Sequence, residues 1–304
     1  MQNQTIFLLE MVLLATESWR KMAFIEKHPI KVGKKMIDDC CSGIKSNDKY
    51  FEEVLPVYAY LCLNVKQNFE ERFSDFSLSE MISFLGKKQR RNADAINDRI
   101  VKALKWLVRN KYIECDLCVS VENIKPKDII RFSLYNSCVS RYDGNTIDNS
   151  DFVIDGGYIV IFVDELLAIR NYCVSAKTNY QKTLLTFCCV RKRIPKRRFQ
   201  NGYNSSENVG KYPEVFSTYY ASLASEIDIS ELYVSEAMRV LRYLNIFYVE
   251  RLKTKKIEKN SGGSIYSAGL CLICEYKKRD FTKELILEGE PYYRKEIESK
   301  KDCI

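Results

Sequence analysis

Cationic side chains gather in three short clusters of the sequence, at positions 87–91, 191–198 and 253–259. Lysine and arginine neutralise phosphates and release condensed counterions, which gives a nucleic acid affinity that depends on salt but not on base sequence. One such cluster alone is more often a solvated loop, whereas three favour a phosphate-binding surface. The candidate phosphate contacts are Lys87, Lys88, Arg90, Arg91, Arg191, Lys192, Arg193, Lys196, Arg197, Arg198, Lys253, Lys255, Lys256 and Lys259.

Residue types that support catalysis are scarce in this chain. Its one histidine, His28, excludes a nicking enzyme built on paired metal-binding histidines and disfavours a hydrolase with a histidine base. No stretch matches the phosphate-binding pattern GxxxxGK[ST], so we expect no ATP hydrolysis. The 20 tyrosines are better explained by packing than by strand-transfer chemistry. We therefore expect neither enzymatic activity nor a cofactor.

Two Cys-x-x-Cys pairs, Cys115–Cys118 and Cys271–Cys274, offer four sulfur ligands of the kind that hold zinc. Both pairs lie in segments that we expect to be strands, where residues three apart point to opposite faces. Cysteine buried in a strand is therefore the favoured interpretation, and we predict no metal site.

The elements around these residues are clearest at positions 223–250, where the pattern predicts a helix, a tight turn, a second helix and a strand. Ser230 stands where it would cap the second helix, and Asn245 stands where a left-handed residue would end it. Ile246, Tyr248 and Val249 begin the strand. The apolar positions at helical spacing are Leu223, Ala224, Ile227, Val234, Ala237, Leu241 and Leu244.

This pattern resembles the winged helix-turn-helix, a DNA-binding module whose second helix enters the major groove. An ordinary helical hairpin in a core is the alternative. The resemblance implies that arginines of the second helix read guanine, a glutamate accepts from cytosine and a serine is permissive. The candidate base-reading residues are Tyr233, Ser235, Glu236, Arg239 and Arg242.

A weaker copy of the pattern precedes this one. It predicts helices at 54–65, 77–86 and 93–109, with Ser77 and Glu80 at capping-box spacing, and a strand from Tyr112 that pairs with 129–134. Acids at the start of its long helix would repel phosphate, so we expect this copy to dimerise or bind protein. The residues at that helix start are Asn92, Asp94, Asn97 and Asp98.

The expected fold class is mainly α with small β-wings (α+β): tandem winged helix-turn-helix domains after an N-terminal helical segment. We predict a helical segment at 1–46 that loosens around 41–43, a first winged-helix domain at 47–140 and a linker at 141–156. A second winged-helix domain at 157–278 and a charged tail at 279–304 complete the chain. Within the second domain we expect a strand at 158–163, helices at 165–172 and 180–191, a wing tip at 253–267 and a returning strand at 268–276.

Composition agrees with a polyanion partner without proving one. The 304 residues carry a net charge of +8, a moderate basic bias. Among the 12 cysteines, the adjacent pairs at 40–41 and 188–189 follow no compact disulfide framework, which predicts reduced thiols in a cytosol. The apolar stretch at 6–15 is too short for a membrane span and lacks the basic start of a signal peptide, so we expect a packed helix there.

Three functional hypotheses follow. The two-module layout resembles replication initiators of plasmids and mobile elements, which implies double-stranded DNA as partner, with self-association or replication proteins at the first domain. A transcriptional regulator would use the same surfaces. A non-catalytic protein-interaction adaptor, such as a primosome component, is the third. We expect cytoplasmic localisation and no membrane partner.

Overall fold

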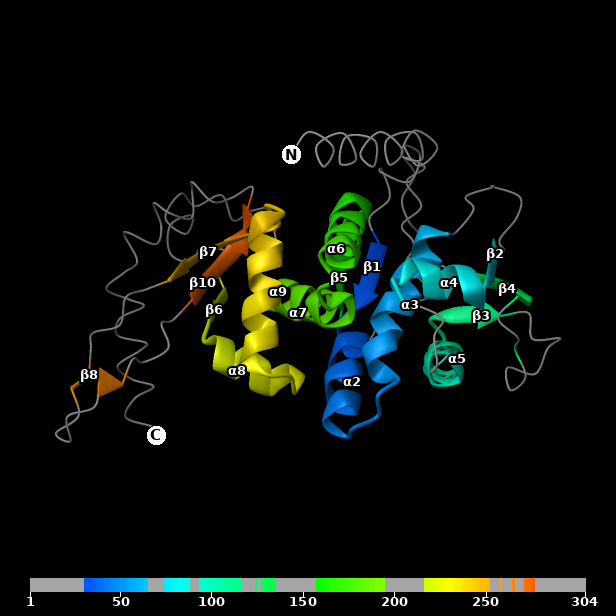
Figure 1. The fold of residues 1–304 in the computed structure, drawn as a ribbon, viewed down its shortest axis with the longest axis horizontal. Coiled ribbons are helices and arrows are strands. Elements are labelled where there is room, and N and C mark those ends of the chain that lie inside the picture. The colour runs from blue at the N-terminus through cyan, green and yellow to red at the C-terminus, as the bar shows by residue number, and fades with distance from the viewer. Residues whose placement is uncertain are drawn as a thin grey trace, which may run out of the picture. The chain divides into compact units, whose positions relative to one another are not determined.

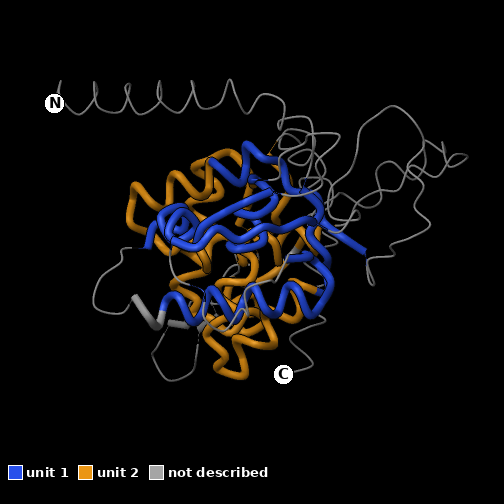
Figure 2. The backbone as a smooth tube through the Cα atoms, turned by 90° about the vertical axis from the view of Figure 1, so that its right-hand side faces the viewer, with its two compact units in different colours: residues 1–35, 56–167 blue, residues 36–55, 168–304 orange. Residues whose placement is uncertain are grey.

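The computed structural model describes residues 30–64, 74–87, 93–115, 124, 127–134, 157–194, 216–251, 257–258, 264–265 and 271–276. These residues are mostly helical with small antiparallel sheets (Figure 1), which confirms the expected mainly α composition. The chain divides into two compact units (Figure 2). Unit 1 takes residues 1–35 and 56–167, and unit 2 takes residues 36–55 and 168–304, so the border falls inside three helices.

Unit 1 contains a three-stranded sheet in which β4 (Ile129–Leu134) lies between β2 (Ser74–Ser77) and β3 (Ile113–Cys115). Both neighbours run antiparallel to β4, with Ile113 opposite Leu134, so the pairing expected from the sequence is confirmed. Strand β2 was not predicted because its sequence, SDFS, contains a single apolar residue and so shows no apolar alternation. The Phe76 and Phe132 rings, 5.4 Å apart, anchor it to β4 in the core.

The helices of this region are α3 (Phe51–Leu63), α4 (Leu78–Phe84) and α5 (Ala93–Arg109). The predicted capping box starts α4. The Ser77 hydroxyl accepts from the Glu80 amide at 3.3 Å, and the Glu80 carboxylate accepts from the Ser77 amide at 3.0 Å. Two amides that the first helical turn leaves without partners are thereby satisfied.

Unit 2 contains most of α2 (Lys34–Lys45) and α6 (Val163–Ala176), together with α7 (Tyr180–Arg193), α8 (Tyr220–Ile227) and α9 (Glu231–Tyr243). Its sheet places β10 (Cys271–Glu275) between β6 (Phe216–Thr218) and β7 (Phe247–Arg251). Between β7 and β10, β8 (Ile257–Glu258) pairs with β9 (Ser264–Ile265) inside the predicted wing tip. Strand β6 was missed by the sequence analysis.

The first described segment differs from the expected helix. Residues 30–33 form strand β1 (Ile30–Gly33), which pairs antiparallel with β5 (Tyr158–Ile161) in unit 1. Helix α2 also runs unbroken through 41–43, where loosening was expected. Its buried residues there, Cys41 and Gly43, are packed in the fold, and tertiary packing outweighs local helix propensity. Three further predictions, the helix within residues 1–29, the linker at 141–156 and the charged tail at 279–304, lie outside the described residues.

The described elements follow one order twice: strand, helix, helix, strand, helix, helix, strand, strand. Elements β1 to β4 make the first pass, and β5 to β10 make the second with the β8–β9 pair inserted. The sheet orders β2-β4-β3 and β6-β10-β7 correspond strand for strand. The sequence predicted the repeated helices and the final strand pairs, but not the short strand between the second and third helices of each pass.

Helix ends repeat as well. Among the described residues, six in the left-handed conformation terminate helices at corresponding places in the two passes. After each one, the next amide donates to the carbonyl five residues before it. This is the Schellman bond, which satisfies a carbonyl at the helix end. Asn245, at φ 55°, confirms the predicted left-handed end of α9. The three corresponding pairs are Asn47 and Lys177, Gly86 and Asp228, and Lys111 and Asn245.

Candidate nucleic-acid interface

Helices α8 and α9 are joined by a short turn that begins at Asp228, a left-handed residue at φ 62°. The Ile229 amide donates to the Ala224 carbonyl at 3.1 Å, which ends α8. Ser230 occupies the N-cap position of α9 as predicted, but its side chain makes no cap hydrogen bond. The buried residues that hold the pair together are Leu223, Ala224, Ile227, Val234, Ala237, Met238, Val240 and Leu241.

The outer side of α9 carries most of the predicted base-reading residues. Rotation by 100° per residue puts Ser235, Glu236 and Arg239 on one stripe, opposite the buried face. The Arg239 side chain is 78% exposed, and its guanidinium lies 4.0 Å from the Glu236 carboxylate. Arg242 is exposed at the edge of this stripe. These four residues share one accessible helix surface, which we call the α9 outer stripe.

Tyr233 lies elsewhere on α9. Its ring is at the side of the helix that borders the buried face, and the Lys182 ammonium of α7 stands 3.7 Å from the ring centroid. This cation–π contact makes Tyr233 part of the α7–α9 packing as well as a partly exposed residue.

Two exposed apolar residues complete the outer stripe and were not singled out from the sequence. Leu232 is 76% exposed and Tyr243 is 70% exposed. The Tyr243 ring lies 5.1 Å from the ring of Tyr172 on α6. Their position could have been predicted from helical spacing, because residues four apart share a helix face. Leu232 precedes Glu236 by four positions, and Tyr243 follows Arg239 by four.

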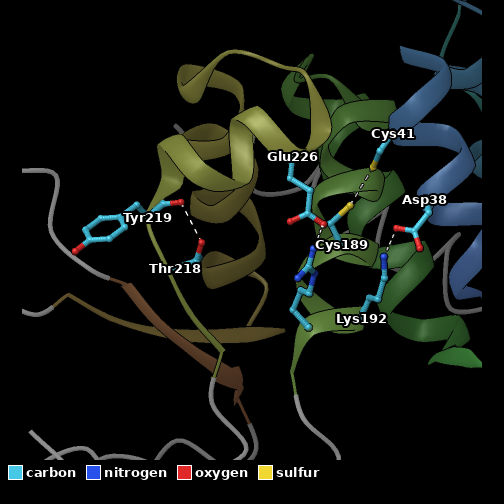
Figure 3. A network of polar contacts seen from close by, with 8 residues as sticks. Asp38, Cys41, Cys189, Lys192, Thr218, Tyr219 and Glu226 are labelled. Carbon is cyan, nitrogen blue, oxygen red and sulfur yellow. Dashed lines mark hydrogen bonds and ion pairs between the residues drawn. The ribbon is translucent and has the colours of Figure 1, made fainter. Parts of the chain in front are cut away.

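The described part of the second basic cluster is engaged inside unit 2 (Figure 3). Lys192 of α7 donates to the Asp38 carboxylate of α2. Arg193 donates to the Glu226 carboxylate of α8 at 2.6 Å, and this hydrogen bond raises the pKa of the Arg193 guanidinium. Both cations are candidate phosphate contacts, but a phosphate would have to compete with these carboxylates.

Arg191 does not fit the expected role of a phosphate contact. It is only 4% exposed, and its guanidinium packs 4.7 Å from the centre of the Phe187 ring and 3.9 Å from the Glu275 carboxylate. Its place on the buried side of α7 explains the difference, because the run of basic letters in the sequence does not show which one faces inward. The structure therefore removes Arg191 from the accessible cations.

Of the first basic cluster, Lys87 follows the end of α4 and is partly exposed. The other predicted phosphate contacts lie outside the described residues. They are Lys88, Arg90, Arg91, Lys196, Arg197, Arg198, Lys253, Lys255, Lys256 and Lys259.

Arg251, at the end of β7, is an exposed cation that the sequence analysis did not single out. Its guanidinium lies 5.2 Å from the centre of the Tyr220 ring, and a hydrogen bond with Tyr220 raises the pKa of the arginine. Arg251 lies two residues before the third basic cluster, at 253–259, so β7 positions a cation at the start of the predicted wing.

The thiols that were considered for zinc are placed as follows. Cys271 and Cys274 are buried in β10, and Cys115 at the end of β3 is partly buried, with its pKa raised to about 11 by burial. Cys118 lies outside the described residues. Within the described ranges, no three histidine, cysteine or acidic side chains come together as a metal site would require.

In the earlier module, Asp98 near the start of α5 forms an ion pair with Lys102 at 2.8 Å, and both side chains are more than half exposed. Asn97 is partly buried on the same helix. Asn92 lies outside the described residues, as does the side chain of Asp94.

Comparisons with protein-family models, with curated proteins and with solved structures found no match to this chain. None of the helices that the structure describes combines the length and the apolar character needed to cross a bilayer.

Proposed function

We propose that the chain is a double-stranded DNA-binding protein built from two winged helix-turn-helix modules, and that it initiates replication of a plasmid or mobile element. The element order supports this proposal. Each pass through the described elements contains four helices, and the last three of them, α3 to α5 or α7 to α9, have a short strand after the first of the three. Two sheet strands end the pass, of which the last is central in the sheet.

The observation that carries the proposal is the α9 outer stripe. Helix α9 packs through Val234, Ala237 and Leu241, while Arg239 and Glu236 stay accessible on the opposite side. An arginine in the major groove donates to guanine O6 and N7, and a carboxylate accepts from the cytosine amino group. Their ion pair is exposed and weak, so exchanging it for base contacts costs little.

Phosphate binding is assigned to cations at the ends of β7 and α7. Arg251 is the last residue of β7, and Lys192 and Arg193 are the last two residues of α7. Because Lys192 and Arg193 already contact Asp38 and Glu226, their contribution to binding is smaller than that of unpaired lysines. We expect steep salt dependence to come chiefly from the clusters at 196–198 and 253–259.

The first test is selection from random double-stranded DNA at two salt concentrations, followed by sequencing. Enrichment of a repeated or palindromic site whose binding weakens steeply with salt supports the proposal. Absence of both enrichment and salt-sensitive binding contradicts it.

Arg239→Ala tests the base-reading role. Loss of one good bidentate contact costs about 1–3 kcal/mol of discrimination, so affinity for the selected site falls roughly 5- to 150-fold while non-specific binding changes little. Lys45→Ala, which removes an exposed positive charge at the end of α2, is the matched control. An unchanged preference among sites in Arg239→Ala would make the assignment wrong.

The position of the selected site distinguishes the two DNA-binding hypotheses. A site at the replication origin of the element, with loss of plasmid maintenance in Arg239→Ala, supports an initiator. A site at a promoter, with altered transcription and normal maintenance, supports the transcriptional regulator instead.

An adaptor function is the second candidate, and the exposed apolar residues of α9 favour it. Leu232 and Tyr243 lie on the same outer stripe as Arg239 and would suit a protein surface as well as a groove. The accessible Asp98–Lys102 pair on α5 likewise suits a protein partner better than phosphate. The adaptor would be supported by salt-insensitive binding to a replication protein that Leu232→Ala weakens, together with no measurable affinity for DNA.

A further inference from the structure

Two adjacent cysteine pairs, left unexplained by the proposed function, meet in unit 2. Cys40 and Cys41 lie on α2, and Cys188 and Cys189 lie on α7. The sulfur atoms of Cys41 and Cys189 are 3.6 Å apart, although the two residues are separated by 148 positions in the chain (Figure 3). All four side chains are buried, with Cys41 the most exposed at 6%.

From this geometry we propose that Cys41 and Cys189 are a site of reversible oxidation, at which a small disulfide such as glutathione disulfide converts the two thiols into a disulfide that joins α2 to α7. The proposal does not depend on DNA binding.

The distance is short enough for the reaction. A disulfide bond is about 2.05 Å long, so the two sulfur atoms must approach by about 1.5 Å, which small rotations of the two side chains provide. The ion pair between Asp38, three residues before Cys41 on α2, and Lys192, three residues after Cys189 on α7, also holds α2 against α7.

The two thiols differ in reactivity. A hydrogen bond from Cys189 lowers the pKa of Cys41, while the same bond and burial raise the pKa of Cys189. Nearby Glu226 and Asp38 oppose the Cys41 thiolate and Lys192 favours it. Cys41 is therefore the attacking thiolate and Cys189 is the resolving thiol, since the thiolate is the nucleophilic form.

The reaction balances in two exchanges. The Cys41 thiolate attacks one sulfur of glutathione disulfide and expels one glutathione as its thiolate. Cys189 then loses its proton, its sulfur attacks the Cys41 sulfur, and the second glutathione leaves. Two protein thiols and one small disulfide become one protein disulfide and two glutathione thiols.

Metal binding is the competing use of four neighbouring thiols. No group of three potential ligands with the spacing of a metal site occurs among the described residues. Burial also raises the pKa of Cys40 and of Cys188, which disfavours the thiolate that thiol–disulfide exchange requires.

The test treats the reduced full-length chain with glutathione disulfide under native conditions, blocks the remaining thiols by alkylation, and maps the linked peptides by mass spectrometry. The expected product is a Cys41–Cys189 link that dithiothreitol reverses. Cys40→Ser with Cys188→Ser is the matched control and keeps the link, whereas Cys41→Ser abolishes it.

A link through Cys40 or Cys188, or no link while the chain remains folded, would overturn the proposal. Because serine in this buried site could unfold the chain, Cys41→Ala and circular dichroism accompany the serine variants. A second measurement uses the unaltered chain. Its unfolding midpoint rises by several degrees on oxidation, since a cross-link between distant residues restricts the unfolded state. An unchanged midpoint in a fully linked chain would contradict the assigned link.

Discussion

Single residues in the basic cluster of α7 have different roles although the sequence presents them as one run. Arg191 packs against Phe187 and Glu275 inside unit 2, Lys192 contacts Asp38, and Arg193 contacts Glu226 at the surface. Removing one partner from a buried ion pair lowers the free energy of unfolding far more than removing one partner from an exposed pair. The roles can therefore be separated by stability measurements.

We predict that Arg191→Ala lowers the free energy of unfolding by about 3 kcal/mol, because it removes one member of a buried ion pair and opens space against Phe187. Arg193→Ala, the control at the exposed end of the same helix, changes it by less than about 1 kcal/mol. Urea unfolding followed by circular dichroism measures both. If Arg191→Ala instead weakened DNA binding without changing stability, Arg191 would be a phosphate contact after all.

At the scale of elements, close packing decides where helices meet. Gly43 in α2 lies so near Phe51 of α3 that an added Cβ would stand 1.9 Å from a ring carbon. Only a hydrogen fits at this position, so the turn between these helices depends on the glycine.

We predict that Gly43→Ala destabilises the chain by about 1–3 kcal/mol through overpacking, which outweighs the roughly 1 kcal/mol that alanine gains over glycine inside a helix. Ser42→Ala, an exposed neighbour in α2, is the control and leaves stability nearly unchanged. Thermal unfolding compares the two variants. A stabilised Gly43→Ala would show that the Phe51 ring moves aside at no cost.

For the whole molecule, buried thiols contribute to the response to alkaline pH, together with tyrosines whose pKa burial also raises. Burial raises the pKa of Cys40 and Cys188 above the usual 9.0, and the hydrogen bond with Cys41 together with burial does so for Cys189. Above pH 9.0 the unfolded chain therefore loses protons that the folded chain keeps. Burial raises the pKa of Cys115, Cys173 and Cys271 as well. Cys41, whose pKa is lowered, acts in the opposite direction but is one described thiol against six.

We predict that the free energy of unfolding is constant up to about pH 8 and falls as pH rises through 9, by at most about 1.4 kcal/mol per pH unit for each thiol that stays protonated. Urea unfolding of the reduced chain at about pH 8 and about pH 10 measures the fall. Cys188→Ala removes one of these thiols and should reduce the slope. A slope equal to that of the unaltered chain would exclude Cys188 as a contributor.

The sequence by itself determined the local features of this protein: the periodic helices, the capping box at Ser77, the left-handed end at Asn245 and the exposed side of α9 with Arg239. Each depends on residues within a few positions of one another, so side-chain type and spacing are sufficient to predict it.

Tertiary structure alone decided the rest. Strands β2 and β6 contain one apolar residue each, and β1 lies in a segment expected to be helical. All three form because partners far along the chain supply their hydrogen bonds. The burial of Arg191 and the meeting of Cys41 with Cys189, 148 positions apart, likewise depend on which faces of distant helices pack together. Contacts between residues distant in sequence are set by the packing of the folded chain, which no short window of sequence contains.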